Sequence, residues 1–178
     1  DDAGRAFAAA VDRTVAELGG LDIVVNNAGV MLLGPIEGAD TEDWRRMIDT
    51  NVYGLMYLTH AAVPYLLTRG GGDIVTMSSV TALLGRIGNL HYVTSKAALI
   101  GFTRALAREA GPEHIRVNAL ILGAIRTPVE AVYGSQEEVD ATVLPLQSLK
   151  RRGIPSDVGG VVSFLVSGDA GFITGQCI

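Results

Sequence analysis

Apolar side chains along this chain alternate between two spacings. Residues 2–18 have apolar side chains three to four positions apart, as on one face of a helix, and Gly19 and Gly20 end that pattern. A short apolar run follows at residues 21–25. Continuously apolar runs between helical segments are typical of strands that are buried on both faces of a parallel sheet.

The same alternation continues to the end of the chain. Further helices are expected at residues 40–69, 91–110 and 155–167, and further strands at residues 73–77, 115–122 and 172–178. Residues 123–153 show no periodic pattern, and we expect a mobile loop there. The fold class that follows is α/β, with one domain over residues 1–178 that holds a doubly wound, Rossmann-like parallel sheet in three α/β/α layers.

Composition narrows the class of protein. With 48% hydrophobic residues and a mean hydropathy of +0.33, the 178 residues can form a substantial core. The net charge of −5 disfavours nucleic acids and anionic membranes as partners, so we expect a small-molecule partner. No apolar run approaches the roughly 20 residues that a membrane-spanning helix needs.

Cysteine and histidine usage bears on metal binding and on the cellular compartment. Cys177 is the only cysteine, which excludes an internal disulfide and a cysteine-based zinc site. His60, His91 and His114 lack the spacing of metal ligands. We therefore expect no metal and a cytoplasmic location.

Polar and glycine residues follow three of the expected strands. Asn26, Asn27, Ala28 and Gly29 follow the first strand, Ser78 and Ser79 the second, and Gly123, Ile125 and Thr127 the third. Ligands of an open parallel sheet bind beyond the carboxyl ends of its strands. We therefore expect these residues to face one crevice.

Tyr92 and Lys96 are four positions apart on an expected helix, so their side chains share one face of it. Lowering the pKa of a tyrosine from 10 toward 7 requires roughly 4 kcal/mol, which a nearby ammonium and a positive nicotinamide ring can supply. Tyr92 could then act as a general acid or base while Ser79 donates a hydrogen bond to the same substrate oxygen. Neither residue accepts electrons, so the interconversion of an alcohol and a carbonyl also needs a hydride carrier such as nicotinamide.

These residues and their spacing resemble a known family. Asn26-Asn27-Ala28-Gly29, Asn51, Ser79 and Tyr92-Val93-Thr94-Ser95-Lys96 are similar to the landmarks of the compact short-chain dehydrogenase/reductases. Ser79 precedes Tyr92 by 92−79 = 13 positions, and Asn51 precedes Ser79 by 79−51 = 28, both as in that family. The Tyr-x-x-x-Lys motif alone would be unspecific, whereas four landmarks in register are specific.

The resemblance implies a role for each landmark. Tyr92 would give or take the proton, Ser79 would orient the substrate, and Lys96 would bind the nicotinamide ribose and lower the pKa of the phenol. Asn51 would complete a catalytic tetrad, interrupt its helix and hold a water that links the lysine to solvent. The implied cofactor is NAD or NADP, and the residues implied to contact it are Asn26, Asn27, Ala28, Gly29, Tyr92, Lys96, Gly123, Ile125 and Thr127.

The chain departs from the family pattern in its first part. The glycine-rich turn that holds the pyrophosphate does not occur before Asp22, so we expect this chain to be the C-terminal part of the fold, truncated at the N-terminus and at the extreme C-terminus. The strand at residues 21–25 would then form an exposed apolar edge. Leu122 also stands where the family usually has proline.

Several functions stay open. The leading one is an NAD(P)-dependent oxidoreductase that interconverts a secondary alcohol and a ketone. The second is a catalytically inactive fragment or interaction module of the same fold that cannot bind dinucleotide, and a weaker third is a relative that uses the tyrosine for epimerisation or dehydration. Small residues on the Tyr92 helix suit close helix pairing between subunits, so a homodimer or homotetramer is expected; these residues are Ala97, Ala98, Gly101 and Ala105.

Overall fold

Three parallel strands form the sheet at the centre of the molecule. The computed structural model describes residues 2–178, and its strands are β1 (Ile23–Asn26), β2 (Gly72–Ser79) and β3 (Ile115–Leu122), in the spatial order β1-β2-β3. The register places residue 23 opposite residue 73, and residue 72 opposite residue 115. All three strands therefore end at the same edge of the sheet.

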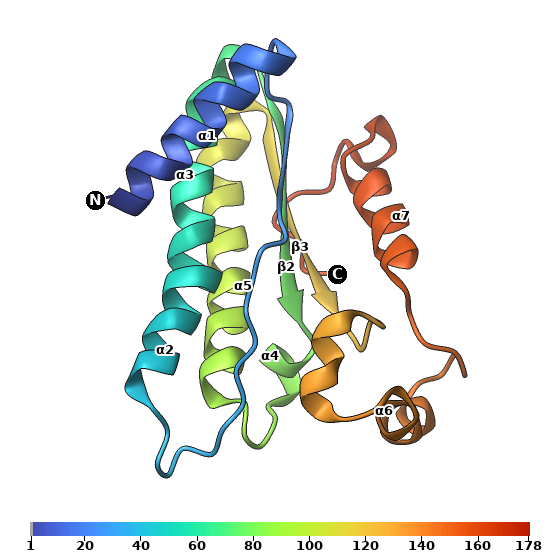
Figure 1. Cartoon of the computed structure of the whole chain (residues 1–178). Coiled ribbons are helices and arrows are strands. Elements are labelled where there is room, and N and C mark those ends of the chain that lie inside the picture. The colour runs from blue at the N-terminus through green and yellow to red at the C-terminus, as the bar shows by residue number, and fades with distance from the viewer. Residues whose placement is uncertain (1) are drawn as a thin grey trace.

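Helices cover both faces of this sheet (Figure 1). One face carries α1 (Asp2–Leu18), α2 (Thr41–Ile48), α3 (Gly54–Thr68) and α5 (Leu90–Ala110), and the other carries α7 (Pro155–Leu165). The short helices α4 (Thr81–Leu84) and α6 (Gln136–Val143) lie near the carboxyl ends of the strands. The expected doubly wound α/β/α arrangement is confirmed. Within residues 2–178, no helix has both the length and the apolar character that crossing a bilayer requires.

The core has two parts, one on each face of the sheet. Ile74 packs with Leu66 of α3 and Ala107 of α5 on the first face. Met77 packs with Leu165 of α7 on the second. Because neighbouring residues of β2 enter opposite halves of the core, this strand has to be apolar on both sides. The continuous apolar runs in the sequence reflect that requirement.

The long helix that was expected at residues 40–69 is interrupted. A π-helical segment, Asp49–Tyr53, separates α2 from α3 and contains Asn51. Such wider turns occur frequently at functional sites. The expected interruption at Asn51 is therefore confirmed.

The last seven residues do not form the strand that was expected at residues 172–178. The chain does run beside β3, where Ala119 N donates to Gln176 O over 2.8 Å, but a single parallel bridge, from Ala119 to Cys177, is formed. The Thr174 hydroxyl, and not a backbone carbonyl, accepts from Val117 N, and Gly175 has a φ of +71°. Both features interrupt a regular ladder.

The stretch at residues 123–153 contains more regular secondary structure than was expected. It contains two 3₁₀ turns, Pro128–Tyr133 and Leu144–Leu146, on either side of α6. Ser135 caps α6, because its hydroxyl accepts from Glu138 N while Glu138 accepts from Ser135 N over 2.8 Å. A capping box is a sequence signal for the start of a helix. It did not lead to a predicted helix here, because the segment has no apolar periodicity.

Candidate functional site

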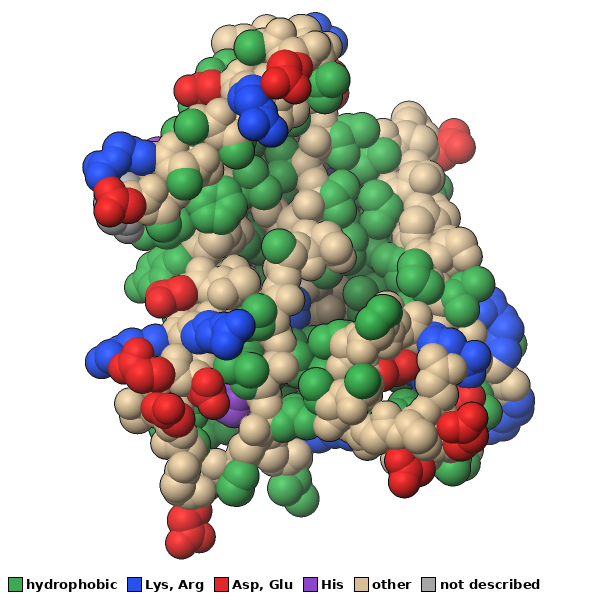
Figure 2. All heavy atoms as spheres, in the orientation of Figure 1, with side chains coloured by type: hydrophobic (Ala, Val, Ile, Leu, Met, Phe, Trp, Pro, Cys, Tyr) green, Lys and Arg blue, Asp and Glu red, His purple; other side chains and the backbone are tan. Residues whose placement is uncertain are grey.

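A cavity of about 750 Å³ lies beyond the carboxyl ends of the strands. Figure 2 shows the molecule hollowed near the middle of one face, with hydrophobic side chains gathered around the hollow. Seven of the nine expected cofactor residues line the cavity, together with Ser79: Asn27, Gly29, Tyr92, Lys96, Gly123, Ile125 and Thr127. Asn26 and Ala28 line a separate cavity of about 320 Å³, which also contacts Asn51. The three strand exits thus meet, as the sequence predicts.

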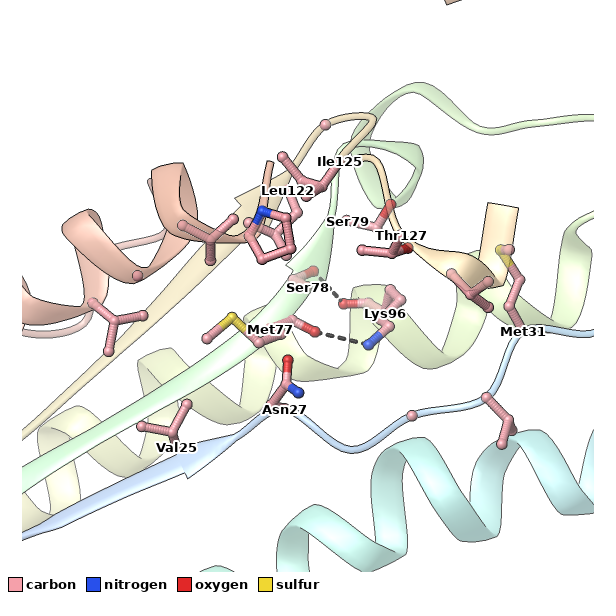
Figure 3. Close-up of a pocket in the computed structure, with 18 of the residues that line it drawn as sticks. Val25, Asn27, Met31, Met77, Ser78, Ser79, Lys96, Leu122, Ile125 and Thr127 are labelled. Atoms are coloured by element: carbon pink, nitrogen blue, oxygen red, sulfur yellow. Dashed lines mark hydrogen bonds between the residues drawn. The ribbon is translucent and has the colours of Figure 1, made fainter. Parts of the chain in front are cut away.

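Lys96 reaches the cavity wall from α5 and is held by β2. Its Nζ donates to the Met77 carbonyl over 2.8 Å, and its own carbonyl accepts from the Ser78 hydroxyl over 2.8 Å (Figure 3). The residue is 7% exposed, and burial lowers the pKa of its ammonium to about 8. An ammonium has three N–H donors, so those not used by Met77 are available to a ligand.

Tyr92 and Ser79 lie together on the wall of the same cavity. Burial raises the pKa of the Tyr92 phenol above its ordinary value, Ser79 lowers it by less, and Tyr133 raises it further. The Ser79 hydroxyl itself lies 2.9 Å from the Thr81 hydroxyl. In this structure, Lys96 is not among the groups that shift the pKa of Tyr92. The physical reason is that Nζ lies 5.8 Å from the centre of the Tyr92 ring and is directed to Met77, while burial removes the water that would stabilise a phenolate.

Asn51 connects three parts of the chain behind the cavity. Its Oδ1 accepts from Val30 N over 2.8 Å, and its Nδ2 donates to Val30 O and to the Ser95 hydroxyl, each over 3.0 Å. The side chain is 2% exposed. Asn51 therefore fixes the loop after β1 against α5, the helix that carries Tyr92 and Lys96.

The loop after β1 passes close to Asn51 and Lys96, and a glycine suits this closeness. A Cβ atom at Gly29 would lie 3.1 Å from Asn51 Oδ1 and 3.4 Å from Lys96 Nζ. The backbone here forms a floor that a larger residue would push away from the lysine. Free N–H donors, two hydroxyls and apolar walls fit the nicotinamide half of a dinucleotide, so the residues present are compatible with this cofactor. Among residues 2–178, no cluster of three or more histidine, cysteine or acidic side chains is placed to hold a metal ion.

Four further residues line these cavities that the sequence did not indicate. A further cavity of about 470 Å³ shares Ser79 and Tyr92 with the first and is also lined by Arg86 and Tyr133. Val158 and Val162 of α7 line the first cavity. Arg86 and Tyr133 lie in segments without periodicity, so no sequence signal marked them. The valines belonged to an expected helix, but nothing in the sequence indicated which of its residues face the cavity.

Comparison with known proteins places this geometry in a family. A family model described as enoyl-(acyl carrier protein) reductase matches residues 3–178. The chain is 36% identical over 168 residues to a 3-oxoacyl-(acyl-carrier-protein) reductase of Thermotoga maritima, which covers 94% of this chain and 68% of that protein. It is 39% identical over 161 residues to the Homo sapiens dehydrogenase/reductase SDR family member 4, which covers 90% of this chain and 58% of that protein.

A solved structure agrees with these relatives. A 7α-hydroxysteroid dehydrogenase complexed with NADH and 7-oxo glycochenodeoxycholic acid superimposes with a TM-score of 0.93 at 31% identity, covering 98% of this chain and 68% of that one. The chain thus spans between 58% and 68% of the length of these three proteins. With a family model that matches nearly every residue and relatives well above 30% identity, this chain belongs to the short-chain dehydrogenase/reductase family of oxidoreductases.

Proposed function

We propose that this protein interconverts a secondary alcohol and a ketone by hydride transfer with NAD or NADP, and that Tyr92 is its general acid and base. The observation that carries the proposal is that Ser79 and Tyr92 line a wall that two cavities share, with Lys96 one helical turn from Tyr92. The names of the similar proteins support it, since they are reductases and dehydrogenases.

The proposed mechanism divides the work between cofactor and protein. The nicotinamide supplies or accepts the hydride. The hydroxyls of Ser79 and Tyr92 donate hydrogen bonds to the substrate oxygen, and Tyr92 delivers the proton when a ketone is reduced. Because the pKa of Tyr92 is raised in this structure, the phenol is protonated at neutral pH, as reduction requires. Alcohol oxidation needs the phenolate, so the proposal includes an oxidation rate that increases toward alkaline pH.

The proposed cofactor contacts are the residues that line the larger cavity. Lys96 has N–H donors for hydroxyl groups, and Gly29 lets the backbone approach the ligand closely. Gly123, Ile125 and Thr127 would contact it from the exit of β3. Asn26 and Ala28 line the neighbouring cavity, so they would affect the cofactor indirectly, by positioning the loop after β1. Asn51 holds that loop in place.

Replacing Tyr92 by phenylalanine tests the mechanism. Tyr92→Phe removes the ionisable hydroxyl and keeps the ring, so turnover should fall by roughly 10²–10⁴-fold. The stabilisation that NADH or NADPH gives in a thermal shift assay should not change. Tyr53→Phe, the same change at an exposed tyrosine outside both cavities, should keep full activity. Comparable turnover by Tyr92→Phe and the original protein would refute the role of Tyr92.

The same assay separates the second candidate function. A catalytically inactive module would show no thermal stabilisation by NADH or NADPH and no turnover of any alcohol or ketone. Stabilisation by either dinucleotide would contradict that alternative and would also show which cofactor is preferred. As further parts of the proposal, the protein acts on a small molecule in the cytoplasm as a homodimer or homotetramer.

A further inference from the structure

Ser79 and Tyr92 line two cavities, and the smaller cavity, of about 470 Å³, contains a cation. No carboxylate of the described chain neutralises this cation. Three charged side chains line this cavity: Arg86, Glu130 and Glu138. Glu130 forms an ion pair with Arg152, and Glu138 accepts from the backbone N–H of Ser135 at the start of α6. Both carboxylates therefore already have partners.

Arg86 has a different kind of partner. Its guanidinium carbon lies 4.3 Å from the centre of the Tyr133 ring, and no carboxylate within residues 2–178 forms an ion pair with it. Stacking on a ring orients a guanidinium and leaves its N–H donors free in the plane. A stacked arginine therefore retains its capacity for a planar anion.

The ring beneath Arg86 is itself fixed in place. Asn89 donates from Nδ2 to the Tyr133 hydroxyl over 3.1 Å, and that hydroxyl lies 3.0 Å from the sulfur of Met31. Asn89 is buried. Tyr133 thus joins the loop after β1, the segment before α5 and the 3₁₀ turn Pro128–Tyr133, so the ring is held in place, while Arg86, whose guanidinium lies over it, is exposed.

We propose that Arg86 binds a carboxylate of the substrate, at the end of the molecule remote from the reacting carbonyl. A carboxylate is the planar anion that accepts two parallel N–H bonds from a guanidinium. Ser79 and Tyr92 line the same cavity, so one substrate can reach both the hydroxyl pair and the guanidinium. The substrates would then be oxo acids and hydroxy acids. This assignment rests on the proposed function, because it places the reacting carbonyl at Ser79 and Tyr92.

Matched pairs of charged and neutral ligands test the proposal. Isothermal titration calorimetry would compare 4-oxopentanoate, 6-oxoheptanoate and 8-oxononanoate, each with its methyl ester, with and without NAD⁺ or NADP⁺, because the oxidised cofactors cannot reduce a bound ketone during the titration. The original protein should bind at least one acid about tenfold more tightly than its ester. Arg86→Ala should remove that preference and leave ester binding unchanged, and Arg86→Lys should restore part of it, because lysine keeps the charge without the planar fork.

Arg108→Ala is the matched control, because Arg108 is exposed on α5 and lines neither cavity. It should retain the preference for the acid. Equal binding of acid and ester at every length, no binding of any acid, or an unchanged preference in Arg86→Ala would each overturn the proposal. Turnover assays distinguish the two hypotheses. Reduction of the esters without a preference for acids would support the oxidoreductase function and refute carboxylate binding by Arg86. Preferential binding of acids without any turnover would support carboxylate binding and refute the oxidoreductase function.

Discussion

Lys96 lies in surroundings that oppose its own charge. The burial that lowers the pKa of its ammonium to about 8 also brings the side chain to the cavity wall, where one acceptor, the Met77 carbonyl, is provided by the protein. A buried cation with a single neutral acceptor destabilises the folded state. Such a cost is typical of functional sites, where a ligand supplies the missing partners.

The free-energy cost of burying the charged ammonium of Lys96 predicts how the stability of the protein depends on pH. Because the pKa in the folded state, about 8, is below the ordinary 10.5, the unfolded chain binds more protons than the folded chain between these values. The free energy of unfolding should therefore rise with pH from 8 to 10.5, and the cost is fully present below pH 8. The difference of 10.5−8 = 2.5 pKa units corresponds to up to about 3 kcal/mol.

Lys96→Met removes the titrating group and keeps much of the volume. At pH 7 the variant should be more stable than the original protein by up to about 3 kcal/mol, less the hydrogen bond to Met77, which is worth about 1 kcal/mol. The advantage should shrink as the pH approaches 10.5. Urea denaturation of both proteins across this range measures the difference, in which the effects of other groups cancel. A difference that does not vary with pH would show that Lys96 titrates normally.

At the residue scale, the sequence predicted which side chains meet at the site, but it did not predict their pKa values. The spacing of Ser79, Tyr92 and Lys96 predicted that they would meet, and they do. The pKa of Tyr92 could not be predicted, because it depends on how far the phenol is removed from water. Tyr133, 41 positions further along the chain (133−92), also raises this pKa, and a single sequence does not reveal such a pairing.

At the element scale, ion pairs hold the helices that follow β3. Arg152 is 6% exposed and binds Glu130 of the 3₁₀ turn Pro128–Tyr133 as well as Asp140 of α6, the latter over 2.6 Å. Arg126 contacts the other oxygen of Asp140 over 2.6 Å. One buried guanidinium thus ties together the segments that border the smaller cavity. The pattern of apolar residues could not predict this order, because charge pairs from three separate segments produce it.

Arg152→Met should release these elements. Removing one partner of a buried ion pair costs about 3–5 kcal/mol when the remaining charge has no other partner. Here Glu130 would lose Arg152 while Asp140 would keep Arg126, so the loss should lie at the lower end of that range. Part of that cost should appear as local opening, so amide hydrogen exchange should become faster in α6 than in α5. Arg151→Met is the matched control: its side chain pairs with Asp157 at the surface, where solvent screens the two charges, so its loss should change the stability little. Equal destabilisation by both variants would contradict the role of Arg152.

At the scale of the whole molecule, two exposed surfaces remain without a partner in a single chain. Ile23 and Val25 of β1 are 43% and 40% exposed, which confirms the expected apolar edge beside a strand that pairs with β2 alone among the described strands. The small residues of α5 form the second surface, and all four are exposed: Ala97, Ala98, Gly101 and Ala105. Exposure of small residues along one helix permits close approach of a second helix.

Gly101 offers a test of the expected homodimer or homotetramer. A Cβ at this position would meet no atom within 4 Å, so the single chain has room for a large side chain there. Gly101→Trp should not lower the stability of the single chain through helix propensity, because tryptophan favours a helix more than glycine does, but it should separate subunits that pair through α5. Light scattering should give a dimer or tetramer for the original protein and a smaller species for the variant. Gly160→Trp on α7, where the space is equally open and which lines neither cavity, should keep the original mass. A monomeric original protein would refute self-association, and an unchanged mass in Gly101→Trp would place the contact elsewhere.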